Sequence, residues 1–355
     1  MKRILFVLPS LSAANGVASF LLNYLEAMNE PRLSFSVLAG DVDPSRFREE
    51  ALERLSVPYD YIPTVERVGV SGFYRALSRF FDTHEGFSAI YNNAENWSPF
   101  LLSLARRHGI QSFALHAHAT KPSEKPLKSI RNRFLSLLSL PFVSERVACS
   151  YAAGRAFFGN RDVKVIPNAV DPTRFSFDEG IRKSKREELG ISEKTALYGF
   201  VGRFSRQKNP FFFLSLAEAL SDEDAKILMV GDGEDKAELL RETHIRGLTE
   251  KIMFLPPTSD VAPLYFAMDA LLLPSHFEGL PVVAVEAQMA GLPCLISDTV
   301  TRETAFSEAT HFLPRGDIGL WKRMLPREKT RYPAYDARFD IKETAKEMEK
   351  LLLSL

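Results

Sequence analysis

Short apolar runs alternate with longer amphipathic segments along the whole chain, and this alternation limits the folds that are open to it. Buried strands of a parallel sheet read as short apolar runs, and each needs a crossover of helical length before the next. The pattern therefore predicts an α/β fold in which helices cover parallel strands. In the first half we expect strands at 4–8, 35–39, 59–62, 89–91, 112–115, 146–149 and 164–166, and helices that include 19–28, 72–81 and 98–107.

The alternation stops at a break and then starts again. Pro167, Asn168 and Pro172 favour turns, and residues 177–194 are rich in charge. We expect the strands of the second half at 196–201, 226–230, 252–255, 270–273 and 294–297.

Two Rossmann-like domains that face each other across a cleft are the simplest architecture for this repeated pattern. We expect an N-terminal domain at residues 1–170 and a C-terminal domain at 171–338. The segment 339–355 has the apolar spacing of a helix. The sequence leaves its packing open, and a return to the N-terminal domain is one option.

The composition excludes some classes of partner. The chain has 355 residues, enough for about two domains with proper cores, and its 45% hydrophobic and 25% charged content is typical of soluble globular proteins. Lysine plus arginine equals aspartate plus glutamate at 45 each, so no overall field attracts nucleic acid. We expect no nucleic-acid partner, and any site for an anion must be local.

The two cysteines and the N-terminus favour a cytoplasmic protein. Cys149 and Cys294 each lie in an apolar, strand-like run, which is typical of buried thiols in a reducing compartment. Ile4 to Leu8 is shorter than the apolar core of a signal peptide, about 7 to 15 residues, and we interpret it as a strand. No run approaches the roughly 18 apolar residues of a membrane span.

Residues 271–297, LLLPSHFEGLPVVAVEAQMAGLPCLIS, place two carboxylates around the start of a short helix. Pro281 suits the first helical position and Gly291 the helix end, so Glu278 falls in the loop and Glu286 in the helix. Glu286 lies about 7.5 Å along the axis from Pro281. The alternative is an ordinary loop and helix with two solvated glutamates.

The start of this helix suits a phosphate. The N–H groups of a first helical turn have no carbonyl within the helix, so with the positive end of the helix dipole we expect those near Gly279 and Leu280 to favour an anion. Vicinal hydroxyls donate well to a carboxylate, so Glu286 would suit a ribose and Glu278 a sugar beyond the phosphates.

Residues 198–210, YGFVGRFSRQKNP, bring positive charge to the end of another strand. The chain turns at Gly202, and we expect Asn209 to cap the next helix. Arg203 offers a planar fork to phosphate oxygens and Lys208 a mobile point charge, so together they could balance a departing diphosphate without a metal ion. The alternative, a solvated basic loop, is the interpretation we adopt for Arg206.

No cofactor or metal site is predicted. Asp41-Val42-Asp43 has the form of a metal-binding acidic pair, but it precedes a proline and lacks a nearby histidine or cysteine, so we interpret it as a turn. Gly231 begins a glycine turn that would permit a close approach to a base or ribose, which is a weak signal by itself.

Two further motifs follow strands of the first half. His116 and His118 are two residues apart, so an extended chain points both side chains the same way, and one of them could line the cleft opposite Glu278. Structural histidines are the equal alternative. Asn15-Gly16 could admit a phosphate to the backbone or could merely begin a helix.

Taken together, these motifs resemble the retaining glycosyltransferases of sequence family four, which have the two-domain GT-B fold. The resemblance covers nearly the whole chain and is strongest over 165–299. It rests on the paired glutamates Glu278 and Glu286, on the turn with Gly202, Arg203 and Lys208, and on the linker sequence IPNAVDPTRF at 166–175. Several such motifs in the right order are specific where one would be weak.

The resemblance implies a role for each matching residue. Arg203 and Lys208 would bind the donor diphosphate, Glu286 the ribose, Glu278 the transferred sugar, and Gly16 the phosphates. His116 best matches the cleft histidine that contacts the donor sugar, with His118 as its nearest rival.

The implied reaction is transfer from a nucleotide sugar, most simply a uridine diphosphate sugar, to an acceptor hydroxyl with retention at the anomeric carbon. The acceptor would lie with residues 1–170 and the donor with 171–338. The sequence around Glu286 resembles that of family members that build capsule, exopolysaccharide or lipopolysaccharide. Asn15-Gly16 stands where relatives often carry two glycines, and Pro256-Pro257 where many have a glycine near the base.

The segment Lys121 to Leu140 carries several basic residues beside a helical apolar stripe. It could touch anionic lipid as an interfacial helix, or it could be a core helix with a solvated face. We therefore expect a glycan or lipid-linked acceptor and a cytoplasmic enzyme that could work at the inner face of the membrane. The competing functions are a sugar-nucleotide epimerase or phosphorylase of the same fold, and a non-catalytic binding partner.

Overall fold

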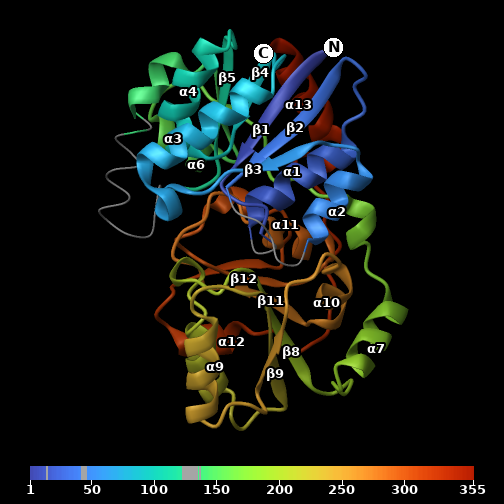
Figure 1. Ribbon diagram of the computed structural model, residues 1–355. Helices are drawn as coiled ribbons and strands as arrows, with labels where there is room; N and C mark the ends of the chain where they lie inside the picture. The colour runs from blue at the N-terminus through green and yellow to red at the C-terminus, as the bar shows by residue number, and fades with distance from the viewer. Residues whose placement is uncertain (13–14, 41–45, 122–134, 136) are drawn as a thin grey trace. The chain divides into compact units, whose positions relative to one another are not determined.

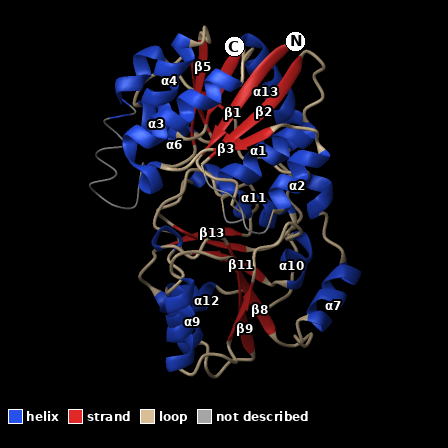
Figure 2. Cartoon of the chain, viewed as in Figure 1, coloured by secondary structure: helices blue, strands red, loops and turns tan. Residues whose placement is uncertain are grey.

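The chain divides into two units in the computed structural model, which describes residues 1–12, 15–40, 46–121, 135 and 137–355 (Figure 1). The first unit comprises Met1–Ala169 together with Ile341–Leu355, and the second comprises Val170–Asp340. Each unit contains one sheet, and the described strand pairs of both sheets are parallel (Figure 2). The expectation of an α/β fold with two Rossmann-like sheets is confirmed.

The sheet of the first unit has the order β3-β2-β1-β4-β5-β6-β7. Its strands are β1 (Lys2–Leu8), β2 (Leu33–Ala39), β3 (Tyr59–Tyr61), β4 (Ala89–Asn92), β5 (Ser112–Ala117), β6 (Glu145–Ala148) and β7 (Lys164–Val165). Its helices are α1 (Gly16–Ala27), α2 (Phe47–Arg54), α3 (Val65–Thr83), α4 (Ser98–Arg107), α6 (Tyr151–Phe158) and α13 (Ile341–Ser354), with 3-10 turns η1 (Glu95–Trp97) and η2 (Leu140–Phe142). Each strand predicted from the sequence is present to within about two residues.

Helix α13 belongs to the core of the first unit. Met348 and Leu352 are fully buried in a cluster with Phe20 and Leu21 of α1 and with alternate residues of β1. The Lys2 ammonium donates to the carbonyl of Leu353 at 2.5 Å, so the two ends of the chain lie together. The last segment of the sequence therefore packs beside α1 against the sheet that contains the first strand (Figure 1).

The sheet of the second unit has the order β10-β9-β8-β11-β12-β13. Its strands are β8 (Ala196–Val201), β9 (Ala225–Val230), β10 (Ile252–Leu255), β11 (Ala270–Leu273), β12 (Cys294–Ser297) and β13 (Thr310–Leu313). Its helices are α7 (Glu179–Glu188), α8 (Phe212–Ala219), α9 (Lys236–Ile245), α10 (Ala262–Ala267), α11 (Val282–Met289) and α12 (Ile318–Met324), with 3-10 turns η3 (Pro172–Phe175), η4 (Arg206–Lys208), η5 (Arg302–Thr304) and η6 (Ala337–Phe339). Strand β13 was not predicted, because it is a short edge strand and only Leu313 in it is buried.

Each sheet reverses its strand order at one place. In the first unit the reversal lies between β1 and β4, and in the second it lies between β8 and β11. The loops on either side of such a point lead away to opposite faces of the sheet, which leaves room for a ligand at the carboxyl ends of the strands. These two places are where the fold itself favours binding.

A buried ionic network fixes the opposite end of the second sheet. Asp269, which precedes β11, accepts hydrogen bonds from Arg182 of α7 at 2.7 Å and from the backbone N–H of Leu197 at 2.8 Å. Arg182 also donates to the last carbonyl groups of α10, and the Arg182 and Asp269 side chains are 4% and 3% exposed. The network ties α7 and α10 to the central strands.

Replacement of Asp269 by alanine should therefore be costly, because it leaves the buried Arg182 guanidinium without its carboxylate. We expect the free energy of unfolding of the second unit to fall by about 3–5 kcal/mol, measured by urea denaturation. Glu188→Ala, which breaks an exposed ion pair with Lys185 on α7, is the matched control and should cost less than about 1 kcal/mol. Equal losses in the two variants would contradict this account.

Candidate functional site

The loops that follow β8 and β11 are joined to each other by hydrogen bonds. Gln207 accepts the backbone N–H of His276 at 2.7 Å and donates through its side chain to the carbonyl of Phe277 at 2.9 Å. Asn209 donates to the carbonyl of Pro274 at 3.3 Å. The strand-order reversal of the second unit is thus bounded by two loops that hold each other in place.

Lys208 and Glu278 meet across these loops. The Lys208 ammonium lies 2.6 Å from a Glu278 carboxylate oxygen, and the two side chains are 18% and 7% exposed. The cation predicted to bind a diphosphate is therefore held by the carboxylate predicted to bind a sugar. Their contact places two of the predicted residues at one point of the sheet edge.

Arg203 has a different partner. Its guanidinium pairs with Glu234, from the loop after β9, at 2.9 Å, and both side chains are about half exposed. An ion pair in solvent contributes at most about 1 kcal/mol, so Arg203 can exchange Glu234 for a phosphate at little cost. The structure does not bring Arg203 into contact with the pair formed by Lys208 and Glu278.

Helix α11 begins where the sequence predicts it to within one residue. Pro281 is the residue before the first helical one, and Gly291 follows the helix with a φ of 67°, a conformation that favours glycine. The first acceptor, the carbonyl of Pro281, takes the N–H groups of Ala284 and Val285. The N–H groups ahead of these have no carbonyl within the helix, and the positive end of the helix dipole lies at this point.

Glu286 is held by a residue that the sequence did not indicate. The Tyr265 hydroxyl of α10 donates to a Glu286 carboxylate oxygen at 2.7 Å, and Tyr265 is fully buried. Burial, together with the Glu286 charge, raises the pKa of Tyr265 well above its ordinary value. The tyrosine therefore stays a hydrogen-bond donor. No sequence pattern links positions 265 and 286, since only the packing of α10 beside α11 brings them together.

Gly231 and Gly233, which follow β9, are required by close contacts with the loop after β8. A Cβ atom at Gly231 would lie 1.9 Å from the carbonyl oxygen of Gly202, and one at Gly233 would lie 2.3 Å from that of Phe204. The φ values of Gly231 and Gly233 are 152° and 158°. The need for glycine at 231 thus follows from the neighbouring loop, without a ligand.

Asn209 does not cap helix α8 as expected. It has a φ of 56° and ends the turn η4, and α8 begins only at Phe212. Asparagine tolerates this left-handed conformation better than most residues, which explains its presence. The prediction recognised the residue type but missed the extra turn that carries Lys208.

In the first unit Asn15 and Gly16 begin helix α1. The Asn15 side chain accepts the N–H of Val17 at 3.0 Å and donates to the carbonyl of Ser10 at 3.0 Å. Gly16 is exposed, and a Cβ atom there would meet no described atom within 4 Å. Among the described residues nothing requires glycine at this position.

The rings of His116 and His118 lie against each other at the end of β5, tilted by 31°. Their spacing predicts that both side chains point the same way. Their ring centroids are 3.9 Å apart, and Phe20 of α1 lies edge-on to both rings. His116 is fully buried and shares a 2.9 Å hydrogen bond with the Tyr91 hydroxyl, whereas His118 is partly exposed. A ligand can reach His118 more readily than His116. The geometry therefore favours His118 as the histidine that contacts a ligand, whereas the sequence favoured His116.

Glu95 lies beside this pair and was missed by sequence reasoning. It stands in η1 after β4, and its carboxylate accepts the backbone N–H of His118. Burial raises the pKa of Glu95 to about 7, although the His118 N–H opposes the shift. Its position after a strand at the order reversal was the available signal, because such loops carry ligand contacts.

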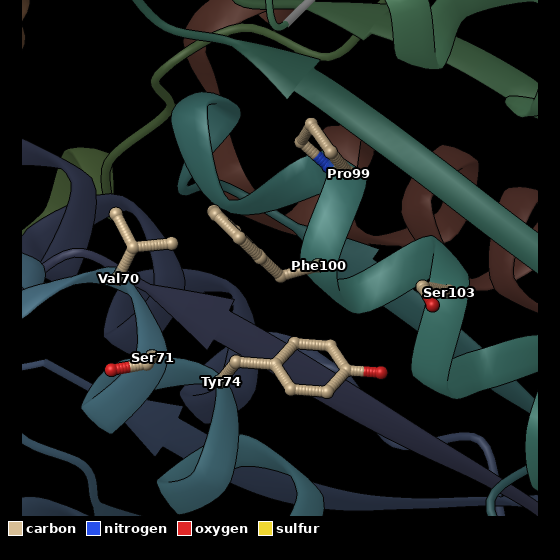
Figure 3. Close-up of a pocket in the computed structure, with 6 residues that line it drawn as sticks. All are labelled: Val70, Ser71, Tyr74, Pro99, Phe100 and Ser103. Atoms are coloured by element: carbon tan, nitrogen blue, oxygen red, sulfur yellow. The ribbon is translucent and has the colours of Figure 1, made fainter.

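A hollow of about 780 Å³ lies between α3 and α4 of the first unit (Figure 3). The figure shows Tyr74 and Phe100 reaching into the space between the two helices. The lining residues are Val70, Ser71, Tyr74, Pro99, Phe100 and Ser103. None of these is charged or was predicted to bind the donor, so the hollow is separate from the predicted diphosphate site.

Two predicted segments lie outside the described residues. These are Asp41-Val42-Asp43 and most of the basic segment Lys121 to Leu140, namely 122–134 and 136. Among the helices that are described, none has both the length and the hydrophobicity to cross a bilayer. In the same parts of the chain, no three histidine, cysteine, aspartate or glutamate side chains are grouped to hold a metal ion.

Comparison with known proteins gives a consistent result for sequence and fold. Residues 181–310 match the family described as glycosyl transferases group 1. The protein EpsF of Bacillus subtilis (strain 168) is 28% identical over 339 residues, which are 92% of this chain and 87% of EpsF. The UDP-Gal:alpha-D-GlcNAc-diphosphoundecaprenol alpha-1,3-galactosyltransferase of Escherichia coli is 32% identical over 141 residues, which are 38% of this chain and 36% of that enzyme.

Among solved structures, Anabaena Alr3699/HepE in complex with UDP-glucose is similar over the full length of both chains, with a TM-score of 0.80 and 19% identity. At that identity the likeness concerns the fold, which is GT-B.

The raised pKa of Glu95 predicts a dependence of stability on pH. The folded protein binds more protons than the unfolded chain between the unfolded pKa of 4.5 and the folded pKa of about 7, so stability falls as the pH rises through this range. Relative to wild type, Glu95→Gln should gain about 1–3 kcal/mol in free energy of unfolding between pH 4.5 and pH 8. Chemical denaturation at several pH values measures this gain. Glu85→Gln removes an exposed carboxyl and is the control; a parallel gain there would refute the assignment to Glu95.

Proposed function

The chain belongs to the group 1 glycosyltransferases, and we propose that it transfers a sugar from a uridine diphosphate sugar to a hydroxyl of a glycan or lipid-linked acceptor, with retention at the anomeric carbon. The observation that carries the proposal is the pairing of Lys208 with Glu278 at the strand-order reversal of the second unit. Two relatives support it by what they bind or use: HepE holds UDP-glucose, and the Escherichia coli enzyme acts on a diphosphoundecaprenol-linked sugar.

The second unit would hold the donor diphosphate without a metal ion. Lys208 and Arg203 supply positive charge from the loop after β8, and the start of α11 supplies backbone N–H groups from the loop after β11. Charge grows on the diphosphate as its bond to the sugar breaks. Donors fixed in place before the reaction stabilise that charge at no further cost of reorganisation.

The ion pair would exchange partners when the donor binds. Before binding, Glu278 is the counter-ion of Lys208. A diphosphate carries more negative charge than a carboxylate and would take over the Lys208 ammonium. Glu278 would then accept hydrogen bonds from hydroxyls of the transferred sugar. Binding of the phosphates and of the sugar would thus be coupled through one lysine.

Glu286 would bind the ribose hydroxyls from inside α11. Its hydrogen bond from Tyr265 fixes the orientation of the carboxylate before the donor arrives. A fixed acceptor loses less side-chain entropy on binding than a mobile one.

In the first unit we propose that Gly16 contributes its backbone N–H to a phosphate and that His118, rather than His116, contacts a substrate hydroxyl. In the reaction the anomeric carbon would lose its bond to the diphosphate oxygen and gain one to the acceptor oxygen on the same face. The departing phosphate would take the acceptor's proton. Such a step needs no protein nucleophile, and catalysis would come from positioning and charge stabilisation.

We place the enzyme in the synthesis of cell-surface polysaccharide, in the cytoplasm and at the inner face of the membrane when its acceptor is lipid-linked. The basic segment Lys121 to Leu140 would supply the contact with anionic lipid. The resemblance to polysaccharide-building enzymes and the acceptor of the Escherichia coli relative support this placement.

Removal of either member of the ion pair should abolish transfer. We expect Lys208→Ala and Glu278→Ala to lower kcat/KM by about 100-fold or more, since each removes a group that acts on the donor. A thermal-shift screen across nucleotide sugars first identifies the donor as the one that raises Tm most, and a transfer assay with that donor follows. UDP should raise the Tm of wild type more than that of Lys208→Ala.

Arg206→Ala is the matched control, because Arg206 is an exposed cation on the same turn. It should keep the activity and the UDP response of wild type. Near-wild-type transfer by either site variant, with circular dichroism unchanged, would refute the proposed function. Sugar release or interconversion without any acceptor would instead support an epimerase or hydrolase.

Loss of the Tyr265 hydroxyl should weaken donor binding without stopping the reaction. We expect Tyr265→Phe to raise the donor KM by about three- to tenfold with little change in kcat, because Glu286 loses the hydrogen bond that orients it. Tyr198→Phe is the control: Tyr198 is also buried and donates to the carbonyl of Pro326, away from Glu286. It should lower stability by a similar amount and leave KM unchanged. A KM that rises equally in both variants would show that the effect is only structural.

A further inference from the structure

Asn93 occupies the strand-order reversal of the first unit in a fixed orientation. It is buried, and both its backbone N–H and its side-chain Nδ2 donate to the carbonyl of Val7 at the end of β1, at 2.8 and 3.2 Å. A carbonyl oxygen only accepts hydrogen bonds, so the amide nitrogen must face Val7. The amide oxygen of Asn93 therefore faces the other way, toward β5.

That oxygen lies 2.8 Å from Nε2 of His118. An amide oxygen has no hydrogen to give, so Nε2 of His118 must carry the proton of this bond. In a neutral imidazole the other nitrogen then holds a lone pair. No hydrogen bond from a described residue reaches that nitrogen, Nδ1.

The surroundings of His118 disfavour a second proton. Burial lowers the pKa of His118 to about 3. Two titratable groups face His118. The His116 ring of β5 lies against the His118 ring, and Glu95 of η1 accepts the His118 backbone N–H. The third neighbour, Phe20 of α1, is apolar. The pKa of His116 is also lowered well below its ordinary value by burial, and His118 contributes to that shift. Neither imidazole would then be charged at neutral pH.

We propose that Asn93 is a positioning residue that fixes the Nε2–H tautomer of His118, so that Nδ1 accepts a hydrogen bond from a substrate hydroxyl. This rests on the proposed function for the identity of the substrate, whereas the tautomer is a property of the protein alone. The class of ligand is a sugar hydroxyl, a neutral hydrogen-bond donor.

The proposal has a consequence for the chemistry. A histidine with an unprotonated Nδ1 orients a hydroxyl and cannot give a proton to the departing phosphate. It also discriminates between ligands, because a substrate that presents only a carbonyl or an ether oxygen would meet a lone pair.

The tautomer can be measured directly. Long-range ¹H–¹⁵N correlation spectra of the ¹⁵N-histidine-labelled full chain distinguish a protonated from an unprotonated ring nitrogen, and His118→Gln and His116→Gln spectra assign the signals. We expect His118 in wild type to be neutral, with the proton on Nε2, from pH 5.5 to 8.5. A proton on Nδ1, or a titration near pH 6.5, would overturn the proposal.

Asn93→Asp tests the positioning role. A carboxylate in place of the amide favours the imidazolium, so the pKa of His118 should rise and a titration should enter the spectra. Protonated Nδ1 no longer accepts a hydrogen bond. The rate of transfer by the variant relative to wild type should therefore fall about tenfold for each pH unit below the new pKa and recover above it. The ratio to wild type removes effects of Glu95, which titrates in both proteins.

Asn160→Asp adds the same charge at an exposed position of the first unit and should show a constant ratio to wild type over the pH range. A constant ratio for Asn93→Asp as well would overturn the positioning role. Should transfer be absent from all proteins, the proposed function fails while the wild-type spectra still decide the tautomer. Should Asn93→Asp not fold, the wild-type spectra still decide which nitrogen of His118 carries the proton.

Discussion

The contact between neighbouring strands β8 and β11 is the constraint on which the candidate site depends. These strands are far apart in sequence, yet their parallel pairing brings the loops that follow them to one edge. Gln207 and Asn209 then hold the loops together, and Lys208 meets Glu278. The pairing of β1 with β4 has the same effect in the first unit, where Asn93 connects the end of one strand to His118 on another.

Charge is balanced locally in the protein as it stands. Lys208 is matched by a sheltered carboxylate, while Arg203 is matched by an exposed one. The first pairing resists removal of either partner, and the second can be exchanged for another anion at small cost. With both kinds of pair, the proposed donor site would remain stable when empty and still attract a diphosphate. The buried network around Asp269 lies at the other end of the same sheet, where it ties α7 and α10 to the central strands.

The sequence predicted every strand except β13 and most of the turns, because apolar periodicity and turn residues are local signals. It also predicted Lys208 and Glu278 as members of one site, since each follows a strand of the same sheet. It could not predict Tyr265 beside Glu286, or Asn93 beside His118, because these contacts depend on how helices and loops pack over many intervening residues. The choice between His116 and His118 also depends on packing. Their spacing predicts that the two side chains point the same way, but it does not predict which one is buried. The capping role expected for Asn209 was wrong, since a left-handed asparagine and a capping asparagine look alike in sequence.

The position of α13 in the first unit affects the order in which the two units can fold during synthesis. The second unit is one continuous stretch of chain, Val170–Asp340, so all of it is synthesised before α13 begins at Ile341. The first unit is begun earlier, but Met348 and Leu352, which fill its interior against β1 and α1, are made only after the whole second unit. Nascent strands of the first unit would therefore wait, partly uncovered, through the synthesis of the second unit, although the N-terminal unit of a chain ordinarily folds first.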